Sequence, residues 1–328
     1  MVAASQTTTH RILICDSVSE ICVRRLQQAG FDLHYEPGLP PERLLELVED
    51  VDALVVRSAT KVTAEVIARA RKLKVIARAG TGVDNIDVAA ATAAGVAVLN
   101  AASANTIAAV EHTFALLLAL CRQIPRAQAS LLAGKWERKA FQGVELYGKT
   151  LGLIGLGRIG REVAKRAQAF QMHVLAVDPL IELRVFVETG VRRCELDELL
   201  QQSDFVSVHA PVTGETKYLL GREQFRICKP GLRLVNAARG GIIDEAALLE
   251  ALKSGRVAGA ALDVFEQEPP RENPLLHLPN VVATPHLGAS TAEAQDRVAE
   301  VIADCLQKYL LHGEAENLIN PEVLKHRD

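Results

Sequence analysis

The chain has 328 residues, which is enough for two domains of ordinary size, each with its own core. Its composition, 49% hydrophobic and 23% charged, is that of a soluble globular protein, and a formal net charge of -3 argues against a nucleic-acid-binding protein. The longest apolar run, residues 114–120, is too short to span a bilayer, and the N-terminus lacks the features of a signal peptide, so we expect a cytoplasmic location.

The first hundred residues alternate short apolar runs with helical patterns. Buried strands are expected at residues 11–16, 52–58, 73–80 and 96–100. A helix between the first two of them is expected to stop at Gly30. A long helix follows over residues 105–123. Because it is apolar on more than one side, we expect it to be buried between domains or against a partner.

A second alternating series begins at Lys149. Its strands are expected at residues 150–157, 173–179, 205–211, 232–240, 258–265 and 280–286. A final helix over residues 290–311 opens with a Ser-Thr cap. The pattern predicts an α/β fold of two doubly wound parallel-sheet domains, with a domain of residues 101–286 inserted into a discontinuous domain of residues 1–100 and 287–328.

A glycine motif, Gly155-x-Gly157-x-x-Gly160, joins the first strand of the second series to a helical pattern. In a dinucleotide-binding turn these glycines allow, in order, the tight turn, close approach to the pyrophosphate, and close helix–strand packing. Asp178 ends the next strand roughly 20 residues on, where a carboxylate accepts the ribose hydroxyls and repels a 2′-phosphate. The motif therefore predicts two Rossmann-like domains, of which residues 101–286 bind NAD rather than NADP and the discontinuous domain binds substrate.

Three charged or titratable residues follow later strands of the same series: Arg239, Glu268 and His286. Ligands of such sheets bind at the carboxyl ends of the strands, so all three are expected to reach one site. Oxidation of a 2-hydroxy acid needs a base for the hydroxyl proton, a carboxylate to orient that base, and a cation for the substrate carboxylate. Taken singly, each residue also fits a structural role: Arg239 as an ion-pair partner, Glu268 as a surface acid, and His286 as the cap of the following helix.

The motifs together resemble the D-2-hydroxyacid dehydrogenase family over nearly the whole chain. The likeness to the wider family is carried by GLGRIGREVA, NAARGGIIDEAAL, AGAALDVFEQEPP and TPHLGAST. The phosphoglycerate dehydrogenase branch is indicated by VVRSATKVTAEVI, RAGTGVDNID and RQIPRAQASLLAGKWERKAFQG. The resemblance implies oxidation of 3-phospho-D-glycerate to 3-phosphohydroxypyruvate, the first step of phosphorylated serine biosynthesis, by a homodimer or homotetramer.

The same resemblance implies roles for individual residues. Arg239 would hold the substrate carboxylate, Glu268 would orient His286, and His286 would be the acid/base. Cofactor contacts would come from the three fingerprint glycines and from Thr81, Arg158, Ile159, Asp178, Ala237, Ala238, Arg239, Asp263, His286, Leu287, Gly288 and Ala289. Substrate contacts would come from Arg57, Ser58, Gly80 and Asn105. The cations available for a phosphate are Arg57, Lys61, Arg78 and Arg138. Lys61 has the alternative of a solvated surface charge, and Arg138 is expected to act on a neighbouring subunit, beside Trp136 as a packing anchor.

Several positions depart from the family pattern without removing a catalytic group. Residues 100–103 read NAAS in place of Asn-Thr-Pro, Ala237 replaces a frequent cysteine, and Ala210 replaces a threonine whose hydroxyl would contact the cofactor. Gln171 stands where glycine is usual, and a left-handed helix cap there would cost about 1 kcal/mol. The sequence ends soon after its last helix, so we expect no C-terminal regulatory domain.

Other functions are weighed against this one. A hydroxypyruvate or glyoxylate reductase would share every catalytic residue and differ in the phosphate-binding cations. A dinucleotide-sensing corepressor on the same fold would also keep the Arg, Glu and His set, and it would bind a repressor peptide without turnover. No metal is expected, because the six cysteines lack CxxC spacing and no His, Cys or Asp cluster has ligand spacing. Neither nucleic acid nor membrane is expected as a partner.

Overall fold

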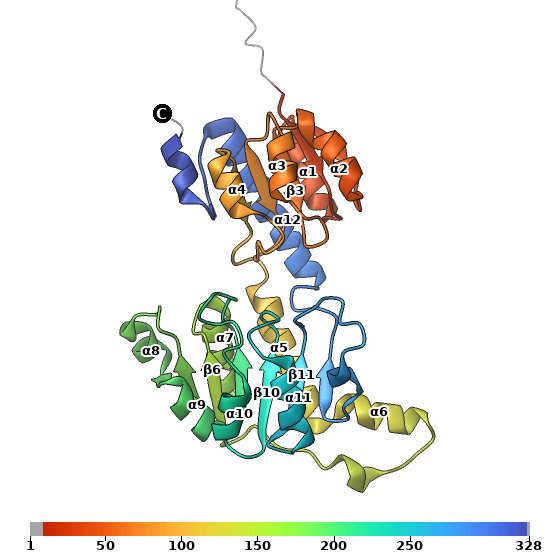
Figure 1. Cartoon of the computed structure of the whole chain (residues 1–328), viewed down its shortest axis with the longest axis vertical. Helices are drawn as coiled ribbons and strands as arrows, with labels where there is room; N and C mark the ends of the chain where they lie inside the picture. Colours follow the sequence, from red (N-terminus) through yellow and green to blue (C-terminus); the bar gives the residue numbers. More distant parts are fainter. Residues whose placement is uncertain (1–8, 327–328) are drawn as a thin grey trace, which may run out of the picture. The chain divides into compact units, whose positions relative to one another are not determined.

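The computed structural model describes residues 9–326, and the chain divides into two compact units (Figure 1). Unit 1 comprises Met1–Asn105 and Ala289–Asp328, and unit 2 comprises Thr106–Gly288. The chain therefore crosses between the units twice, after Asn105 and after Gly288, where the sequence alone places the crossings after residues 100 and 286. The extreme N-terminus, for which no signal peptide is expected, lies outside the described residues.

Unit 1 is built on a five-stranded parallel sheet in the order β2-β1-β3-β4-β5. Its strands are β1 (Arg11–Ile14), β2 (Asp32–Tyr35), β3 (Ala53–Val56), β4 (Val75–Arg78) and β5 (Ala97–Asn100). Its helices are α1 (Glu20–Gln28), α2 (Pro41–Leu47), α3 (Ala64–Arg69), α4 (Val88–Ala93) and α12 (Ala292–Gln307). Four of these strands were predicted from their apolar runs. The edge strand β2 was missed because none of its four side chains is fully buried.

The last long helix, α12, packs in the core of unit 1 although nearly two hundred residues separate it from β5. Its side chains Val298 and Ile302 lie in one apolar cluster with Ile12 and Val55 of the sheet. Thr291 caps the helix by accepting a hydrogen bond from the N–H of Ala294, as the Ser-Thr signal predicts. The C-terminal segment thus completes the domain that the N-terminus begins.

Unit 2 is built on a seven-stranded parallel sheet in the order β12-β11-β10-β9-β6-β7-β8. Its strands are β6 (Thr150–Ile154), β7 (His173–Val177), β8 (Arg192–Arg193), β9 (Phe205–Val208), β10 (Leu232–Asn236), β11 (Val257–Leu262) and β12 (Val281–Ala283). Its helices are α5 (Thr106–Arg122), α6 (Ile124–Leu132), α7 (Arg158–Ala169), α8 (Leu183–Thr189), α9 (Leu196–Gln202), α10 (Arg222–Ile227) and α11 (Glu245–Lys253). The strand order reverses between β6 and β9, which is where doubly wound sheets bind ligands.

The long apolar helix α5 is buried within unit 2, and this corrects our expectation that it lies between domains or against a partner. Val110, Phe114 and Leu117 belong to the same apolar cluster as Leu153 of β6 and Val163 of α7. The helix is apolar on more than one side because it packs on both the sheet and α7. Among the described residues no single helix has the length and hydropathy to cross a bilayer, and the bent pair α5 and α6, at 60°, meets that test only jointly.

Candidate active site

The glycine loop between β6 and α7 exposes backbone at the carboxyl edge of the unit 2 sheet. Gly155 has a φ of 97°, and a Cβ there would lie 2.8 Å from the carbonyl oxygen of His209. A Cβ on Gly160 would lie 2.3 Å from the carbonyl oxygen of Gly155, so only glycine lets α7 start this close to the strand. A Cβ on Gly157 would meet nothing within 4 Å. The loop therefore keeps open space beside the N-terminus of α7, where an anionic pyrophosphate is favoured.

Asp178 follows β7 and fixes this loop from the side. Its carboxylate accepts hydrogen bonds from the N–H of Leu156 at 2.8 Å and from the N–H of Leu180 at 3.0 Å. Arg158 and Ile159 open the first turn of α7 beside it. An open cradle, a helix N-terminus and a strand-end carboxylate together fit the diphosphate and ribose of a dinucleotide.

Arg239 lies in a turn after β10 that is held by its own neighbours. Asn236 accepts a hydrogen bond from the N–H of Ala238 at 3.0 Å and donates its amide to the carbonyl of Arg239 at 2.8 Å. A Cβ on Gly240 would lie 1.8 Å from the carbonyl oxygen of Phe265, so the turn is pressed against the backbone that follows β11. The close packing fixes Arg239 next to the segment that carries Glu268.

His286 and Glu268 form a hydrogen-bonded pair at the ends of β12 and β11. Nδ1 of His286 is 2.8 Å from Oε2 of Glu268, and the two side chains are 48% and 39% exposed. The other carboxylate oxygen of Glu268 accepts the N–H of Phe265 at 3.2 Å, which fixes its orientation. His286 itself has a φ of 55°, a left-handed conformation that is uncommon for a non-glycine residue. The structure thus places together the three residues singled out for catalysis.

The electrostatics of this pair favour a charged histidine. The hydrogen bond that Glu268 accepts from His286, helped by the charge of the carboxylate, raises the pKa of His286 against the opposing effect of burial. Burial raises the pKa of Glu268, but the hydrogen bond and charge of His286 outweigh it, so the pKa of that carboxyl is lowered. The positive charge of Arg239 lowers the pKa of His286, which is opposite to the effect of Glu268. The arrangement can accept a proton on His286 and stabilise the imidazolium that results.

Asp263, at the end of β11, holds the loop that carries His286. Its carboxylate is fully buried and accepts the N–H groups of Leu287 at 2.7 Å and Gly288 at 2.8 Å. Its carbonyl accepts the N–H of His286 at 2.9 Å. The sequence predicts Asp263 as a cofactor contact. In the structure its carboxylate is engaged by the protein's own backbone, which gives it a positioning role.

The predicted substrate residues of unit 1 follow its central strands. After β3, the N–H of Arg57 donates to Asp16 at 2.5 Å and its carbonyl accepts the amide of Asn85 at 2.6 Å. These bonds fix the loop on which Ser58 and Lys61 are exposed. Asp16 and Asn85 were not predicted, because each acts on residues distant in the chain that no local motif connects.

A second group of unit 1 residues follows β4. The Nη1 atom of Arg78 lies 1.5 Å from the position a Cβ on Gly80 would take, so glycine is needed for the guanidinium to lie over this backbone. Thr81 donates its hydroxyl to Asn105 at 2.6 Å. Arg138 lies in unit 2, in an exposed 3-10 turn, Arg138–Phe141.

Comparison with known proteins identifies the family. Residues 114–288 match the family model of the D-isomer specific 2-hydroxyacid dehydrogenase NAD binding domain. The chain belongs to the D-isomer specific 2-hydroxyacid dehydrogenase family. Unit 2 therefore contains the family's NAD-binding domain, in agreement with the fingerprint and with the order of its sheet.

Individual relatives agree with that assignment. This chain is 51% identical over 311 residues to the D-3-phosphoglycerate dehydrogenase of Methanocaldococcus jannaschii, a match over 94% of this chain and 59% of that protein. A solved structure from Thermus thermophilus superposes with a TM-score of 0.86 at 38% identity, over 94% of this chain and 99% of that one. A glyoxylate reductase from Paecilomyes thermophila superposes with a TM-score of 0.87 at 32% identity, over 96% and 99%. The chain spans little more than half the length of the curated relatives it matches.

Proposed function

We propose that this dehydrogenase oxidises 3-phospho-D-glycerate to 3-phosphohydroxypyruvate with NAD, the first step of phosphorylated serine biosynthesis. The observation that carries the proposal is the hydrogen-bonded pair of His286 and Glu268, at the sheet edge that also bears Arg239 and the glycine loop. A base, its orienting carboxylate and a cation beside a dinucleotide cradle are what oxidation of a 2-hydroxy acid requires.

Each residue of this group has a distinct role. His286 takes the proton of the C2 hydroxyl at Nε2, because its Nδ1 is bonded to Glu268. Glu268 holds the ring in that orientation and stabilises the imidazolium. Arg239 binds the substrate carboxylate through paired N–H groups. NAD, held by the glycine loop and α7, supplies the hydride acceptor for C2.

The phosphate is assigned to cations outside this group. We assign substrate binding to unit 1, with Arg57, Lys61 and Arg78 as phosphate ligands. The relatives support a phosphorylated substrate, because identity is 51% to a phosphoglycerate dehydrogenase and 32% to a glyoxylate reductase. The six cysteines are buried free thiols, which supports a reducing compartment such as the cytoplasm.

The test is NADH formation with 3-phosphoglycerate, D-glycerate and D-lactate compared side by side. We expect kcat/KM for 3-phosphoglycerate to exceed that for D-glycerate by about 100-fold, the value of one or two charge-assisted phosphate contacts. Equal or better turnover of an unphosphorylated acid would keep the dehydrogenase chemistry and overturn the substrate. Tight NADH binding without turnover of any of the three would favour the corepressor alternative.

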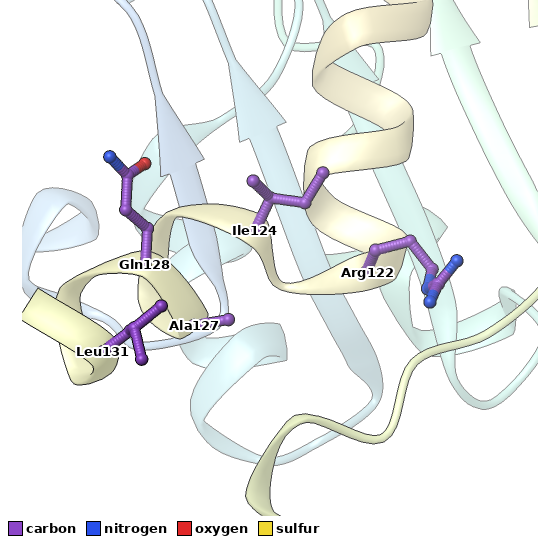
Figure 2. Close-up of a pocket in the computed structure, with 5 residues that line it drawn as sticks. All are labelled: Arg122, Ile124, Ala127, Gln128 and Leu131. Carbon is purple, nitrogen blue, oxygen red and sulfur yellow. The ribbon is translucent and has the colours of Figure 1, made fainter. Parts of the chain in front are cut away.

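We also propose that the enzyme is a homodimer or homotetramer formed through α6 and the segment after it. No residue of α6 is buried, and Leu132 and Trp136 are 80% and 78% exposed. At the bend between α5 and α6, an open groove of about 470 Å³ is lined by Arg122, Ile124, Ala127, Gln128 and Leu131 (Figure 2). Exposed apolar side chains gathered on one segment favour an interface, and a second copy is the commonest partner. In such an assembly Arg138 would serve the partner's substrate.

Sedimentation velocity tests this interface. Leu132→Glu should shift the enzyme toward monomer, because the added charge would be buried against the second copy. Val187→Glu is the matched control, since Val187 is 75% exposed on α8, outside the proposed surface. A monomeric parent protein, or an unchanged oligomer in Leu132→Glu, would refute the interface.

A further inference from the structure

The loop that carries His286 is bonded to a residue of α5, His112, that none of the roles above involves. His112 lies on α5, where its Nε2 atom is 3.1 Å from Oδ1 of Asp263 and 3.1 Å from Oγ1 of Thr284. The Thr284 hydroxyl in turn donates to the same Oδ1 at 2.6 Å. The three side chains therefore meet at one point, although one comes from the start of unit 2 and the others from its end.

These contacts bring four donors onto one buried carboxylate. With Nε2 protonated, His112 joins the hydroxyl of Thr284 and the backbone N–H groups of Leu287 and Gly288 around Asp263. Burial alone would raise the pKa of Asp263, but the bonds from His112, Thr284 and Leu287 outweigh it and keep that pKa below its ordinary value. A buried charge is tolerated only when it is bonded in this way, so each donor contributes to keeping the loop in place.

The loop needs such support because of its backbone. His286 has a φ of 55°, and a left-handed non-glycine residue costs about 1–2 kcal/mol unless its surroundings fix it. Three of the bonds that fix it run to Asp263: the N–H of His286 to its carbonyl, and those of Leu287 and Gly288 to its carboxylate. The N–H of His286 also reaches the carbonyl of Thr284 at 3.1 Å. A shift of the Asp263 carboxylate would therefore move the backbone of His286 and, with it, the imidazole.

The position of the cluster along the chain adds to its significance. The chain enters unit 2 at Thr106, six residues before His112, and leaves it at Gly288, whose N–H is bonded to Asp263. The carboxylate of Asp263, at the end of β11, is thus bonded to residues near both ends of unit 2. Only side chains and backbone of unit 2 take part, so the arrangement is a property of that unit alone.

We propose that His112 is a positioning residue of this dehydrogenase, which acts through Asp263 and Thr284 to hold His286 in its reactive place. The role rests on the proposed function of His286 as the acid/base. His112 does not touch the reacting atoms. It supplies the donor from α5 that completes the set around Asp263.

The test replaces the donor and follows the loop directly. His112→Phe keeps a ring of similar size and removes the N–H, whereas His112→Gln keeps an N–H at about the reach of Nε2. In His112→Phe we expect amide hydrogen exchange at Leu287 and Gly288 to accelerate by about tenfold, with α5 itself unchanged. We expect kcat to fall by about tenfold with KM for the hydroxy acid changed by less than about threefold. His112→Gln should restore most of both.

Two further variants keep the proposal falsifiable. Thr113→Val is the matched control, because Thr113 is the next residue on α5, is buried, and donates its hydroxyl to the carbonyl of Ala109 within the same helix. Its exchange and kinetics should equal those of the parent. If His112→Phe does not fold, His112→Asn makes the same test, since its amide is one methylene shorter than that of glutamine.

The outcomes separate this proposal from the proposed function. Unchanged exchange at Leu287 and Gly288 in the variants that lack the donor would overturn the positioning role, and so would equal effects in Thr113→Val. Faster exchange in a protein that turns over no hydroxy acid would support the link from His112 to the loop while refuting the proposed reaction.

Discussion

Two loops at the carboxyl edge of the unit 2 sheet are built by opposite means. The loop after β6 uses glycines, so that backbone is exposed at Gly157 and α7 can start close to the strand. The loop after β12 carries a large side chain, His286, on a left-handed backbone, and a buried carboxylate holds it there. The first loop supplies space and the second supplies a fixed group, which are the separate needs of binding a dinucleotide and moving a proton.

The largest effect should come from the group held by the second loop. His286→Ala removes the proposed base, and we expect kcat to fall by about 100-fold or more. NADH affinity, measured by fluorescence titration, should stay within about threefold, because the backbone bonds from Leu287 and Gly288 to Asp263 remain. Turnover close to that of the parent would remove His286 from the mechanism.

The first loop should respond to a methyl group according to where it is added. Gly157→Ala adds a Cβ with nothing within 4 Å, so the melting temperature should hold while NADH affinity falls by about tenfold as the pyrophosphate loses its space. Gly160→Ala adds a Cβ 2.3 Å from the carbonyl oxygen of Gly155, so it should lose affinity and also about 1–3 kcal/mol of unfolding free energy. Calorimetry with and without NADH measures both. Equal thermal stability in the two variants would contradict the different roles assigned to these glycines.

The partner of His286 should change the pH dependence of the reaction. Oxidation needs a neutral His286, so kcat/KM rises with pH through the pKa of that residue. Glu268 raises this pKa, so Glu268→Gln should move the midpoint to lower pH and also reduce the limiting rate. Glu266→Gln, two residues away, is the control and should leave the midpoint in place. A midpoint that stays or rises in Glu268→Gln would show that another group controls the profile.

The two loops also differ in how far the sequence reveals them. The glycine loop was predicted from a motif of six residues and the strand before it, although the contact of Gly155 with His209, 54 positions further on, has no local signal. The grouping of Arg239, Glu268 and His286 was predicted too, since the carboxyl ends of parallel strands meet at one edge. His112 and Thr284 were missed, because they meet Asp263 across 151 and 21 positions and no spacing signals it. The missed strand β2 and helix α6 likewise lack the buried apolar pattern on which such predictions depend.

The smallest effect should come from a second left-handed residue, whose side chain is exposed. Gln171, after α7, has a φ of 58° and an exposed side chain, and its position is one where glycine was expected. Gln171→Gly should stabilise the protein by about 0.5–1 kcal/mol, since the left-handed cost of about 1–2 kcal/mol is partly offset by the greater freedom of glycine in the unfolded chain. Ala169→Gly, at the last helical residue of α7, should instead destabilise it by up to about 1 kcal/mol. Neither change should alter kcat. A Gln171→Gly variant that is less stable than the parent would mean that contacts of this side chain offset the free-energy cost of its left-handed backbone, as they do at His286.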